Sequence, residues 1–320
     1  MRPGDFVEAR RRRAQKPKAP RDKRMSAAEA VQLVRDGDTI ALGGCCYARP
    51  PILLIRELLR QGRRNLTVAR NLLSFEGDWF LLAGAATTLI TSWMGPGLPW
   101  GLSRPLRHYV ESGQVRFEEW SHLAIGLRFR AAAMGVPFLP TLTMLGSDLL
   151  AVGGAKTMTC PFTGERLALI PALFPDVALL HVHRADPFGN CQIDGYTHMD
   201  ADIASAATTV LVTAEEIVDP EQIRREPART VIPGFLVDAV VEAPFGAYPG
   251  ECYGRYETDF AHLDAYAAAI AAKGLDGARE YLERYVLGPA THEAYLALFD
   301  PAALARQQQA AQELVSGEPL

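Results

Sequence analysis

The sequence predicts an α/β protein in which an open, largely parallel sheet carries helices on both faces and a layer of helices follows at the C-terminal end. Three observations support this prediction. Short β-like runs alternate with helical runs along most of the chain, glycine-rich turns link strands to helices, and the chain after about Thr258 has only helical patterning. Because strands joined by helical crossovers pair in parallel, the alternation favours a sheet covered on both sides.

The first half of the chain alternates helix and strand. Its first helix begins at Ser26, where Ser26 and Glu29 match a capping box, and Gly37 is placed to close it. A helix also begins at Pro50, and Gly62 follows its end. The pattern predicts strands at 39–44, 66–69, 87–92 and 115–118, and helices at 26–37, 50–61, 79–86, 103–111 and 121–134.

The second half continues the alternation after an irregular stretch. Residues from Leu142 to Pro175 are rich in Gly, Pro and Thr, which predicts loops and a hairpin that cover the sheet. Beyond Thr258, Pro289 and Pro301 are the expected breaks between helices. The remaining expected elements are strands at 177–182, 209–213 and 237–242 and a helix at 199–206.

Charge divides the chain unevenly. Residues 1–24 carry ten Lys or Arg against three acids, a net charge of +7, so the other 296 residues sum to −11 within the total of −4. Such an acidic body disfavours nucleic-acid binding by the globule, although the tail alone can bind polyanions. We therefore expect a basic disordered extension over 1–25, an α/β domain over 26–257, and a helical segment over 258–320 packed on the same domain.

Composition also limits the compartment. No apolar run of about 18 residues is present, so no membrane span is expected. The basic tail lacks the apolar segment of a secretory signal, which favours the cytoplasm. The five cysteines form no C-x-x-C pair, so neither a disulfide framework nor a structural zinc site is expected.

Standard catalytic signatures are missing, so the site must be sought from the topology. The sequence has no G-x-G-x-x-G, P-loop, G-x-S-x-G or H-E-x-x-H motif. In open α/β sheets ligands bind beyond the carboxyl ends of the strands. The segments that follow the predicted strands, and that we therefore single out, are residues 43–49, 70–71, 93–95, 118–122, 146–148 and 183–186.

Two of these features have competing interpretations. Gly43 and Gly44 can expose backbone N–H donors to an oxyanion, or can simply form a tight turn. A second group of residues can ligate a metal, or can hydrogen-bond to neighbouring loops at a polar strand end, and we expect no metal. That group comprises His181, His183, His198 and Asp200.

Several strings, in order from residue 26 to about 245, resemble the A (alpha) subunit of class I CoA-transferases, the glutaconate CoA-transferase type in particular. They are Ile40-Ala-Leu-Gly-Gly44 with Arg49-Pro50, Glu119-Trp-Ser-His-Leu-Ala-Ile-Gly-Leu-Arg-Phe129, Gly135-Val-Pro-Phe-Leu-Pro140, Leu145-Gly-Ser-Asp148, Pro161-Phe-Thr-Gly-Glu165, Ile170-Pro-Ala-Leu173, Pro175-Asp-Val-Ala178, His183-Arg-Ala-Asp186 with Gly189-Asn190, and Ala214-Glu-Glu-Ile-Val218.

The resemblance implies a CoA-transferase fold, related to the sugar-phosphate-isomerase-like fold, and a homologous B subunit in a heterodimer or heterotetramer. It implies transfer of CoA between an acyl-CoA and a free carboxylic acid, with the CoA thioester as substrate and no permanently bound cofactor. In that family a glutamate, normally of the B subunit, attacks the thioester to give a mixed anhydride and then a glutamyl-CoA thioester. This chain lacks the Glu-Asn-Gly type motif, and Glu76-Gly77 and Glu251-Cys252 are its nearest strings. The chain alone is therefore expected to be catalytically incomplete.

The resemblance also suggests what this chain adds to the site. Gly43 and Gly44 offer backbone donors or space for the acyl group, and Arg49 is either a carboxylate clamp or an anchor to a neighbouring acid. Ser121 is either a pocket residue or a helix cap. The other residues expected to line the acid pocket are His122, Gly146 and Ser147.

Two alternatives stay open. Related two-chain hydrolases open a ring in CoA-linked steroid catabolites with a glutamate of their A chain, whose position falls near Ser121-His122 here; neither residue is a carboxylate, but Glu118, Glu119 or His122 can substitute as general base. The other alternative is a non-catalytic sensor or scaffold on the same fold. The sequence leaves the acid open among glutaconate, 3-oxo acids and larger catabolic acids.

Overall fold

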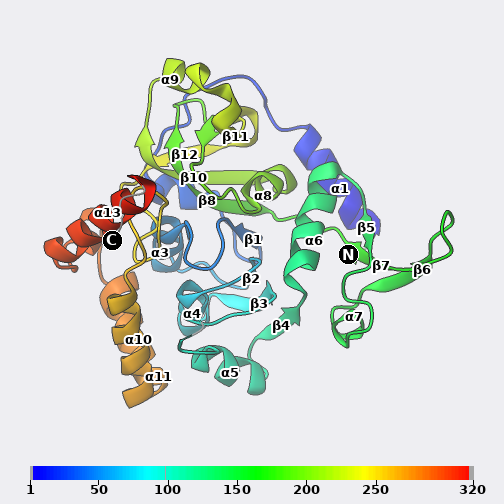
Figure 1. Cartoon of the computed structure of the whole chain (residues 1–320), viewed down its shortest axis with the longest axis horizontal. Helices are drawn as coiled ribbons and strands as arrows, with labels where there is room; N and C mark the ends of the chain where they lie inside the picture. Colours follow the sequence, from blue (N-terminus) through cyan, green and yellow to red (C-terminus); the bar gives the residue numbers. More distant parts are fainter. Residues whose placement is uncertain (1–2, 98, 317–320) are drawn as a thin grey trace.

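The centre of the protein is a nine-stranded sheet, seven strands of which run parallel, as predicted (Figure 1). The computed structural model describes residues 3–97 and 99–316. The parallel strands, in spatial order, are β4 (Arg116–Glu119), β3 (Ala86–Thr91), β2 (Leu66–Ala69), β1 (Thr39–Leu42), β8 (Val177–Ala185), β10 (Thr209–Ile217) and β12 (Ala239–Glu242). Two short strands extend the sheet: β9 (Cys191–Gln192) pairs antiparallel with β8, and β11 (Thr230–Ile232) pairs antiparallel with β9.

Chain order reverses at the middle of this sheet. From β1 the chain moves outward through β2 and β3 to β4, then returns to place β8 on the other side of β1. Ile40 accordingly lies opposite Val68 on one side and Val177 on the other. Such a switch point is where open α/β sheets bind ligands, and the segment that follows β1 lies directly beyond it.

Helices cover both faces, as the alternation predicted. One face packs against α2 (Ala27–Val31), α3 (Ile52–Arg60), α4 (Phe75–Leu82) and α5 (Arg104–Glu111), and the other against α6 (His122–Met134) and α8 (Asp200–Ala206). The C-terminal helices α10 (Phe260–Lys273), α11 (Leu275–Tyr281), a π-helix (Leu282–Leu287), α12 (His292–Leu296) and α13 (Pro301–Ser316) add a layer outside α3 and α4. Shorter elements are α9 (Pro220–Arg225) and the 3₁₀ turns Pro227–Arg229 and Gly234–Leu236.

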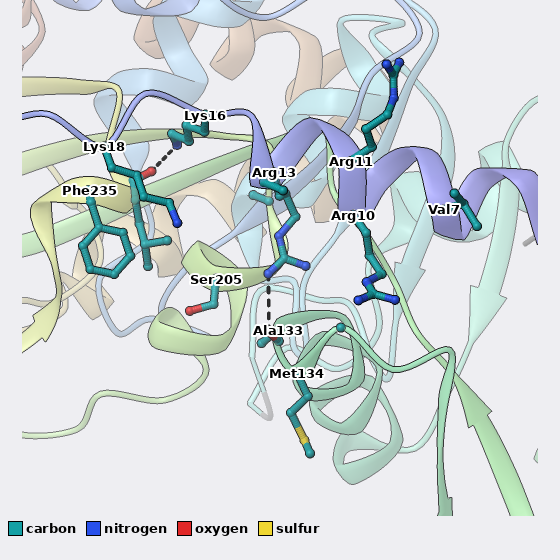
Figure 2. A pocket seen from close by; sticks show the side chains of 14 residues that line it. Val7, Arg10, Arg11, Arg13, Lys16, Lys18, Ala133, Met134, Ser205 and Phe235 are labelled. Atoms are coloured by element: carbon teal, nitrogen blue, oxygen red, sulfur yellow. Dashed lines mark hydrogen bonds between the residues drawn. The ribbon is translucent and has the colours of Figure 1, made fainter.

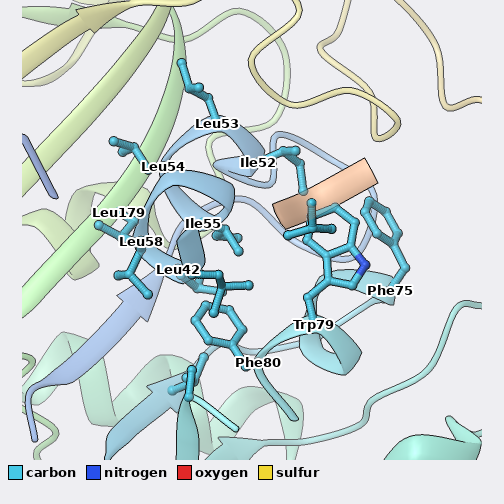
Figure 3. Packing of buried hydrophobic residues seen from close by; sticks show 14 of the residues in the cluster. Leu42, Ile52, Leu53, Leu54, Ile55, Leu58, Phe75, Trp79, Phe80 and Leu179 are labelled. Atoms are coloured by element: carbon cyan, nitrogen blue, oxygen red, sulfur yellow. The ribbon is translucent and has the colours of Figure 1, made fainter. Parts of the chain in front are cut away.

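Helix α3 is buried on almost every side because it lies between the sheet and the C-terminal layer. Leu54, Ile55 and Leu58 are fully buried. In Figure 3, Ile55 lies near Leu42 of β1 and Phe80 of α4, whereas Leu54 and Leu58 lie on the side of Leu179 of β8. Even its polar member is enclosed: the guanidinium of Arg56 lies 3.9 Å from the centre of the Tyr295 ring and donates to two carbonyl oxygens.

Three element predictions need adjustment. The helix expected at 79–86 is α4, which begins at Phe75 and ends before Gly84, whose φ of +61° stops it. The helix expected at 26–37 keeps its capping box but is only one turn long. The irregular stretch holds a helical turn, α7 (Leu149–Val152), and a three-stranded antiparallel sheet of β5 (Phe138–Thr141), β7 (Arg166–Pro171) and β6 (Lys156–Thr159), in which the expected hairpin is β6–β7.

The described part of the basic extension, for which disorder was expected over 1–25, contains a helix that contacts the body of the protein. Helix α1 (Pro3–Ala14) lies against the sheet body, with the Phe6 ring 5.7 Å from that of Phe174. Arg13 donates to the carbonyl oxygen of Ala132 at the end of α6, and Lys16 forms an ion pair with Asp238. The described part of the extension therefore packs against the acidic body, although its composition alone indicated disorder.

Among the residues described, no helix combines the length and the apolar character needed to cross a membrane.

Candidate functional site

The candidate site lies beyond the carboxyl ends of the central strands, where the chain order reverses. The segment after β1, residues 43–49, forms its floor. Arg70 and Asn71 follow β2, Ser121 and His122 follow β4, and His198 precedes α8. These residues come from well-separated parts of the sequence, so the sheet is what brings them together.

The glycine pair after β1 wraps around a buried carboxylate. The Gly43 N–H donates to Leu179 O over 2.9 Å, and the Gly44 N–H donates to Asp200 Oδ1 over 3.1 Å. A Cβ on Gly43 would lie 2.3 Å from Asp200 Oδ1, and one on Gly44 would lie 1.9 Å from Ala48 O. Gly44 also has a φ of +63°. Both N–H groups therefore have acceptors inside the protein, which agrees with the tight-turn interpretation. In this structure neither N–H is free to donate to an oxyanion.

Arg49 has the anchoring role of the two that the sequence left open. Its side chain is only 2% exposed and forms an ion pair with Asp200 over 2.9 Å. The same guanidinium donates to the carbonyl oxygens of His181 and Tyr196. Because both terminal nitrogens donate to protein groups and the side chain is buried, Arg49 does not present a free cation to a substrate carboxylate.

A second buried arginine, Arg70, supports the same segment; the sequence analysis singled it out only because it follows a strand. Arg70 donates to the carbonyl oxygens of Gly43, Cys46 and Ala48. It also pairs with Glu76 over 2.7 Å, and both side chains are fully buried. The sequence indicates Arg70 because it directly follows a strand. Glu76, six residues later, has no comparable signal in the sequence. Glu76 is thus an ion-pair partner inside the protein, and its Oε2 is buried without a hydrogen bond to the described residues.

The tip of the segment carries two neighbouring thiols. Cys45 and Cys46 are half-buried, in a turn closed by paired hydrogen bonds between Cys45 and Ala48. Burial raises the pKa of both thiols, that of Cys46 to about 11, so both stay protonated near neutral pH. Tyr47 is fixed beside them by donating to Pro96 O over 2.5 Å. This turn is a polar, uncharged surface at the site.

Two histidines face the site from different elements. His122 is the first residue of α6, and His198 precedes α8 with a φ of +47°. Burial, together with the nearby charge of Arg49, lowers the pKa of His198, and the charge of His122 acts in the same direction. His198 is therefore neutral at pH 7 and able to accept a proton. The sequence analysis had considered His198 as a metal ligand or as a hydrogen-bonding residue, and not as a proton acceptor.

The two carboxylates at the end of β4 differ in whether they form ion pairs and hydrogen bonds. Glu118 pairs with Arg128 over 2.6 Å and accepts from the Trp120 indole over 2.9 Å. Burial opposes ionisation of Glu118, but the Arg128 charge and these hydrogen bonds outweigh it and lower its pKa. Glu119 is half-buried and makes no side-chain hydrogen bond or ion pair to the described residues. Of the two, only Glu119 has a carboxylate free to act on a ligand.

The remaining predicted pocket residues have structural roles or exposed positions. Ser121 caps α6 by accepting from the Ala124 N–H over 3.1 Å, which agrees with the capping interpretation. Gly146 and Ser147 are exposed just before α7, which packs against β4. Ser147 Oγ accepts from the Leu149 N–H over 3.2 Å. Their backbone can still line a pocket beside Glu119, since Gly153 at the end of α7 approaches the Glu119 carbonyl.

The histidines of β8 form a satisfied buried network. In the described part of the chain, the group of metal-ligating side chains that comes together is His181, Glu215 and Cys252. Both ring nitrogens of His181 already have partners, Thr213 Oγ1 at 2.9 Å and Glu215 Oε1 at 2.8 Å. The ring of His183 likewise contacts Tyr253 O and the Asp194 N–H. The four residues considered from the sequence therefore do not form one ligand set.

Known proteins share the sequence and the fold of this chain. The family profile described as Coenzyme A transferase matches residues 24–243. In structure, the chain is similar to glutaconate coenzyme A-transferase from Acidaminococcus fermentans, with a TM-score of 0.83, 33% identity, and coverage of 89% of this chain and 95% of that one.

Several curated relatives match over most of the chain. The chain is 35% identical to the A subunit of glutaconate CoA-transferase from Acidaminococcus fermentans, covering 85% of this chain and 90% of the relative. It is 34% identical to the A subunit of 3-oxoadipate CoA-transferase from Pseudomonas knackmussii, covering 81% and 92%. The cholesterol ring-cleaving hydrolase IpdA subunit of Rhodococcus jostii is 31% identical, covering 84% and 93%. An uncharacterized protein of Archaeoglobus fulgidus is 43% identical over 83% of this chain, which spans 60% of that relative's length.

Proposed function

The chain belongs to the coenzyme A transferase family, and from that premise we propose that it is the A subunit of a two-subunit enzyme that moves CoA between an acyl-CoA and a free carboxylic acid. The nucleophile is a glutamate of the partner B subunit, which carries CoA as a glutamyl-CoA thioester. The two chains assemble as a heterodimer or heterotetramer. CoA enters as a substrate thioester, and no resident cofactor is required.

The observation that carries this proposal is that three carboxylates around the site are held in ion pairs with arginines. Asp200, Glu76 and Glu118 each form an ion pair with a buried arginine. A carboxylate held by a cation is a poor nucleophile, because attack on the thioester would remove the negative charge that the arginine stabilises. Glu119 is the exception, since its carboxylate has no partner among the described residues. The pairing of the other three supports a divided site, in which the attacking glutamate comes from another polypeptide.

Glu251 is a further glutamate near the site, because its backbone is hydrogen-bonded to the site segment. Its backbone N–H donates to Tyr47 O, and its carbonyl accepts from the Arg49 N–H. Burial raises the pKa of its carboxyl, which accepts from Thr258 Oγ1 over 3.2 Å. A buried carboxyl with a raised pKa favours the protonated form, so we assign Glu251 to the support of the segment.

We propose that this chain supplies one wall of the acid pocket. The turn of Cys45 to Tyr47, the imidazoles of His122 and His198, and the exposed backbone of Gly146 and Ser147 form that wall. Relatives named for glutaconate and 3-oxoadipate favour a dicarboxylic or oxo acid as the acceptor. Recognition of its second carboxylate then falls to His122 or to the partner, since Arg49 is occupied.

A ring-opening hydrolase is the second candidate function. Two observations favour it: the unpaired Glu119 carboxylate and the neutral His198 imidazole are both suited to act as general base from this chain. The similarity to the IpdA chain of the ring-cleaving hydrolase is further support. A non-catalytic sensor or scaffold on the same fold is the third, and it requires that no homologous B chain co-purifies.

The decisive experiment assays CoA exchange between acetyl-CoA and a panel of dicarboxylic and oxo acids, with the chain alone and with its B partner. Borohydride trapping then reports a glutamyl-CoA thioester and the chain that carries it. A transferase gives activity only in the complex, with the trapped thioester on the B chain. Robust exchange by the lone chain would end the divided-site proposal.

Variants of this chain separate transferase from hydrolase. In a transferase, E119Q and H122A change acid selectivity or the KM while the thioester remains trappable. In a hydrolase, one of them lowers kcat by about a hundredfold to ten-thousandfold, with no thioester on either chain. The matched controls E111Q and H108A, on the surface of α5, should leave both readouts unchanged.

A further inference from the structure

A cavity of about 680 Å³ lies at the opposite edge of the sheet from the candidate site. It is bounded by α1, by the C-terminal ends of α6 and α8, and by the turn that carries Phe235 (Figure 2). Ser205 and Ala207 of its wall directly precede β10, so the cavity belongs to the amino ends of the strands. Neither the family resemblance nor the proposed transfer reaction uses this place.

The wall is strongly cationic. The charged residues lining it are Arg10, Arg11, Arg13, Lys16 and Lys18, and no acidic residue lines it. Arg11 pairs with Glu8 and Lys16 with Asp238, at 2.9 and 2.5 Å. The other three have no carboxylate partner among the described residues. Three cations thus line one cavity without a carboxylate partner in the part of the chain that the structure describes.

These charges lie close enough to disfavour one another. Arg13 donates only to neutral acceptors, Ala132 O at 2.6 Å and Ala133 O at 3.4 Å. Burial lowers the pKa of Arg13, and the charge of Arg10 lowers it further. In Figure 2 the side chains of Arg10 and Arg13 extend from α1 in the same direction, toward the end of α6. A bound anion would relieve this repulsion and gain charge-assisted hydrogen bonds.

The wall also contains apolar and aromatic residues, which lie at several places around the cavity. Phe235 is 47% exposed, and the Lys18 side chain and the Ser205 hydroxyl are beside it in Figure 2. Val7 and Met134 are also exposed, at 64% and 60%. An accessible aromatic ring next to cations is suited to stack a flat aromatic group that carries anionic substituents.

We propose that this cavity is a binding site for a nucleotide with two or more phosphates. The phosphates contact Arg10, Arg13 and Lys18, and the base lies against Phe235. The volume is within the range of small-ligand pockets. A nucleic acid fits less well, because the cationic wall is confined to one cavity and the rest of the chain sums to −11.

The test is calorimetric titration of the purified full chain with ATP and with inorganic triphosphate, at low salt and without acyl-CoA. The variant R10Q/K18Q removes two cations that make no hydrogen bonds to the described residues, so the fold is retained. It should weaken both ligands by about tenfold to a hundredfold. The control R104Q/R107Q makes the same charge change on exposed positions of α5 and should leave both affinities within twofold.

A second variant tests the base-binding part of the site. F235A should weaken ATP by about threefold to tenfold while leaving inorganic triphosphate unchanged. Saturable binding of both ligands with this pattern supports the proposal. Failure to bind either ligand, equal weakening by the α5 control, or binding of a single-stranded oligonucleotide more tightly than ATP would overturn it. Because no transfer activity is measured, the result is independent of the proposed function.

Discussion

The two edges of the sheet use arginine in opposite ways. At the carboxyl edge Arg49, Arg70 and Arg128 are buried, and each is paired with a carboxylate at 2.6 to 2.9 Å. At the amino edge Arg10 and Arg13 line an open cavity and have no carboxylate partner among the described residues. Paired arginines build the walls of a site, whereas unpaired ones remain available for a ligand.

The difference shows that charge alone does not identify a binding residue. Arg49 lies in the segment where a substrate clamp was expected, yet its donors are used by Asp200 and two backbone carbonyls. The extension, expected to be a solvated tail, instead presents cations with unused donors. The number of protein acceptors within reach decides the role of each arginine.

The largest expected effect comes from breaking a buried pair. R49M leaves the Asp200 carboxylate fully buried without its cation, and should lower the free energy of unfolding by about 3 to 5 kcal/mol in urea denaturation. The matched control is R130M, whose partner Asp202 is on the same helix but whose own side chain is 60% exposed. That control, and R10M at the amino edge, should each cost about 1 kcal/mol or less. Comparable losses in all three variants would contradict the distinction between the edges.

The next effect tests why the site segment needs its glycine. G44A places a methyl group against Ala48 O in a backbone with φ of +63°, and should cost about 2 to 4 kcal/mol of unfolding free energy. Gly37 is the control, since its φ is +85° but nothing lies within 4 Å of an added Cβ, so G37A should cost only about 1 kcal/mol. Loss of activity in G44A with an unchanged melting temperature would instead restore an oxyanion role for this N–H.

The smallest expected effect concerns Asp78, a buried carboxylate that, unlike the paired carboxylates at the carboxyl edge, has no arginine partner among the described residues. Asp78 accepts from Ser103 and from Tyr266, and burial raises its pKa to about 7. The native state therefore keeps a proton that the unfolded chain releases above about pH 4. This contribution to stability is complete below that pH and is lost as the pH rises toward 7.

D78N cannot lose this proton, so its stability relative to the natural sequence should rise by about 1 to 3 kcal/mol between pH 5 and pH 8. Urea denaturation at several pH values measures the change. D264N, an exposed carboxylate on the same helix as Tyr266, is the control. A pH profile of D78N parallel to that of the natural sequence would show that Asp78 is ionised in the folded protein.

Local patterns predicted most of the fold. The capping box of Ser26 and Glu29 is present, Ser121 caps α6, and Gly135 ends it with a φ of +71°. These signals work because a cap or a stop depends on residues within one turn of each other. The element missed by the largest margin, α4, begins at Phe75 without a side-chain cap.

The sequence by itself determined the parallel sheet and its helical cover, because apolar periodicity, caps and the alternation of elements along the chain are short-range properties. It also directed attention to the carboxyl ends of the strands, where the candidate site lies. Only the tertiary structure decided the roles of individual residues there. Arg49 meets Asp200 across 151 residues, and Gly43 is required because Asp200 approaches it. Arg13 of α1 contacts Ala132, and Lys16 just after α1 contacts Asp238, each more than a hundred residues away. Such pairings depend on which distant groups the fold brings within hydrogen-bond distance, and no local pattern records that.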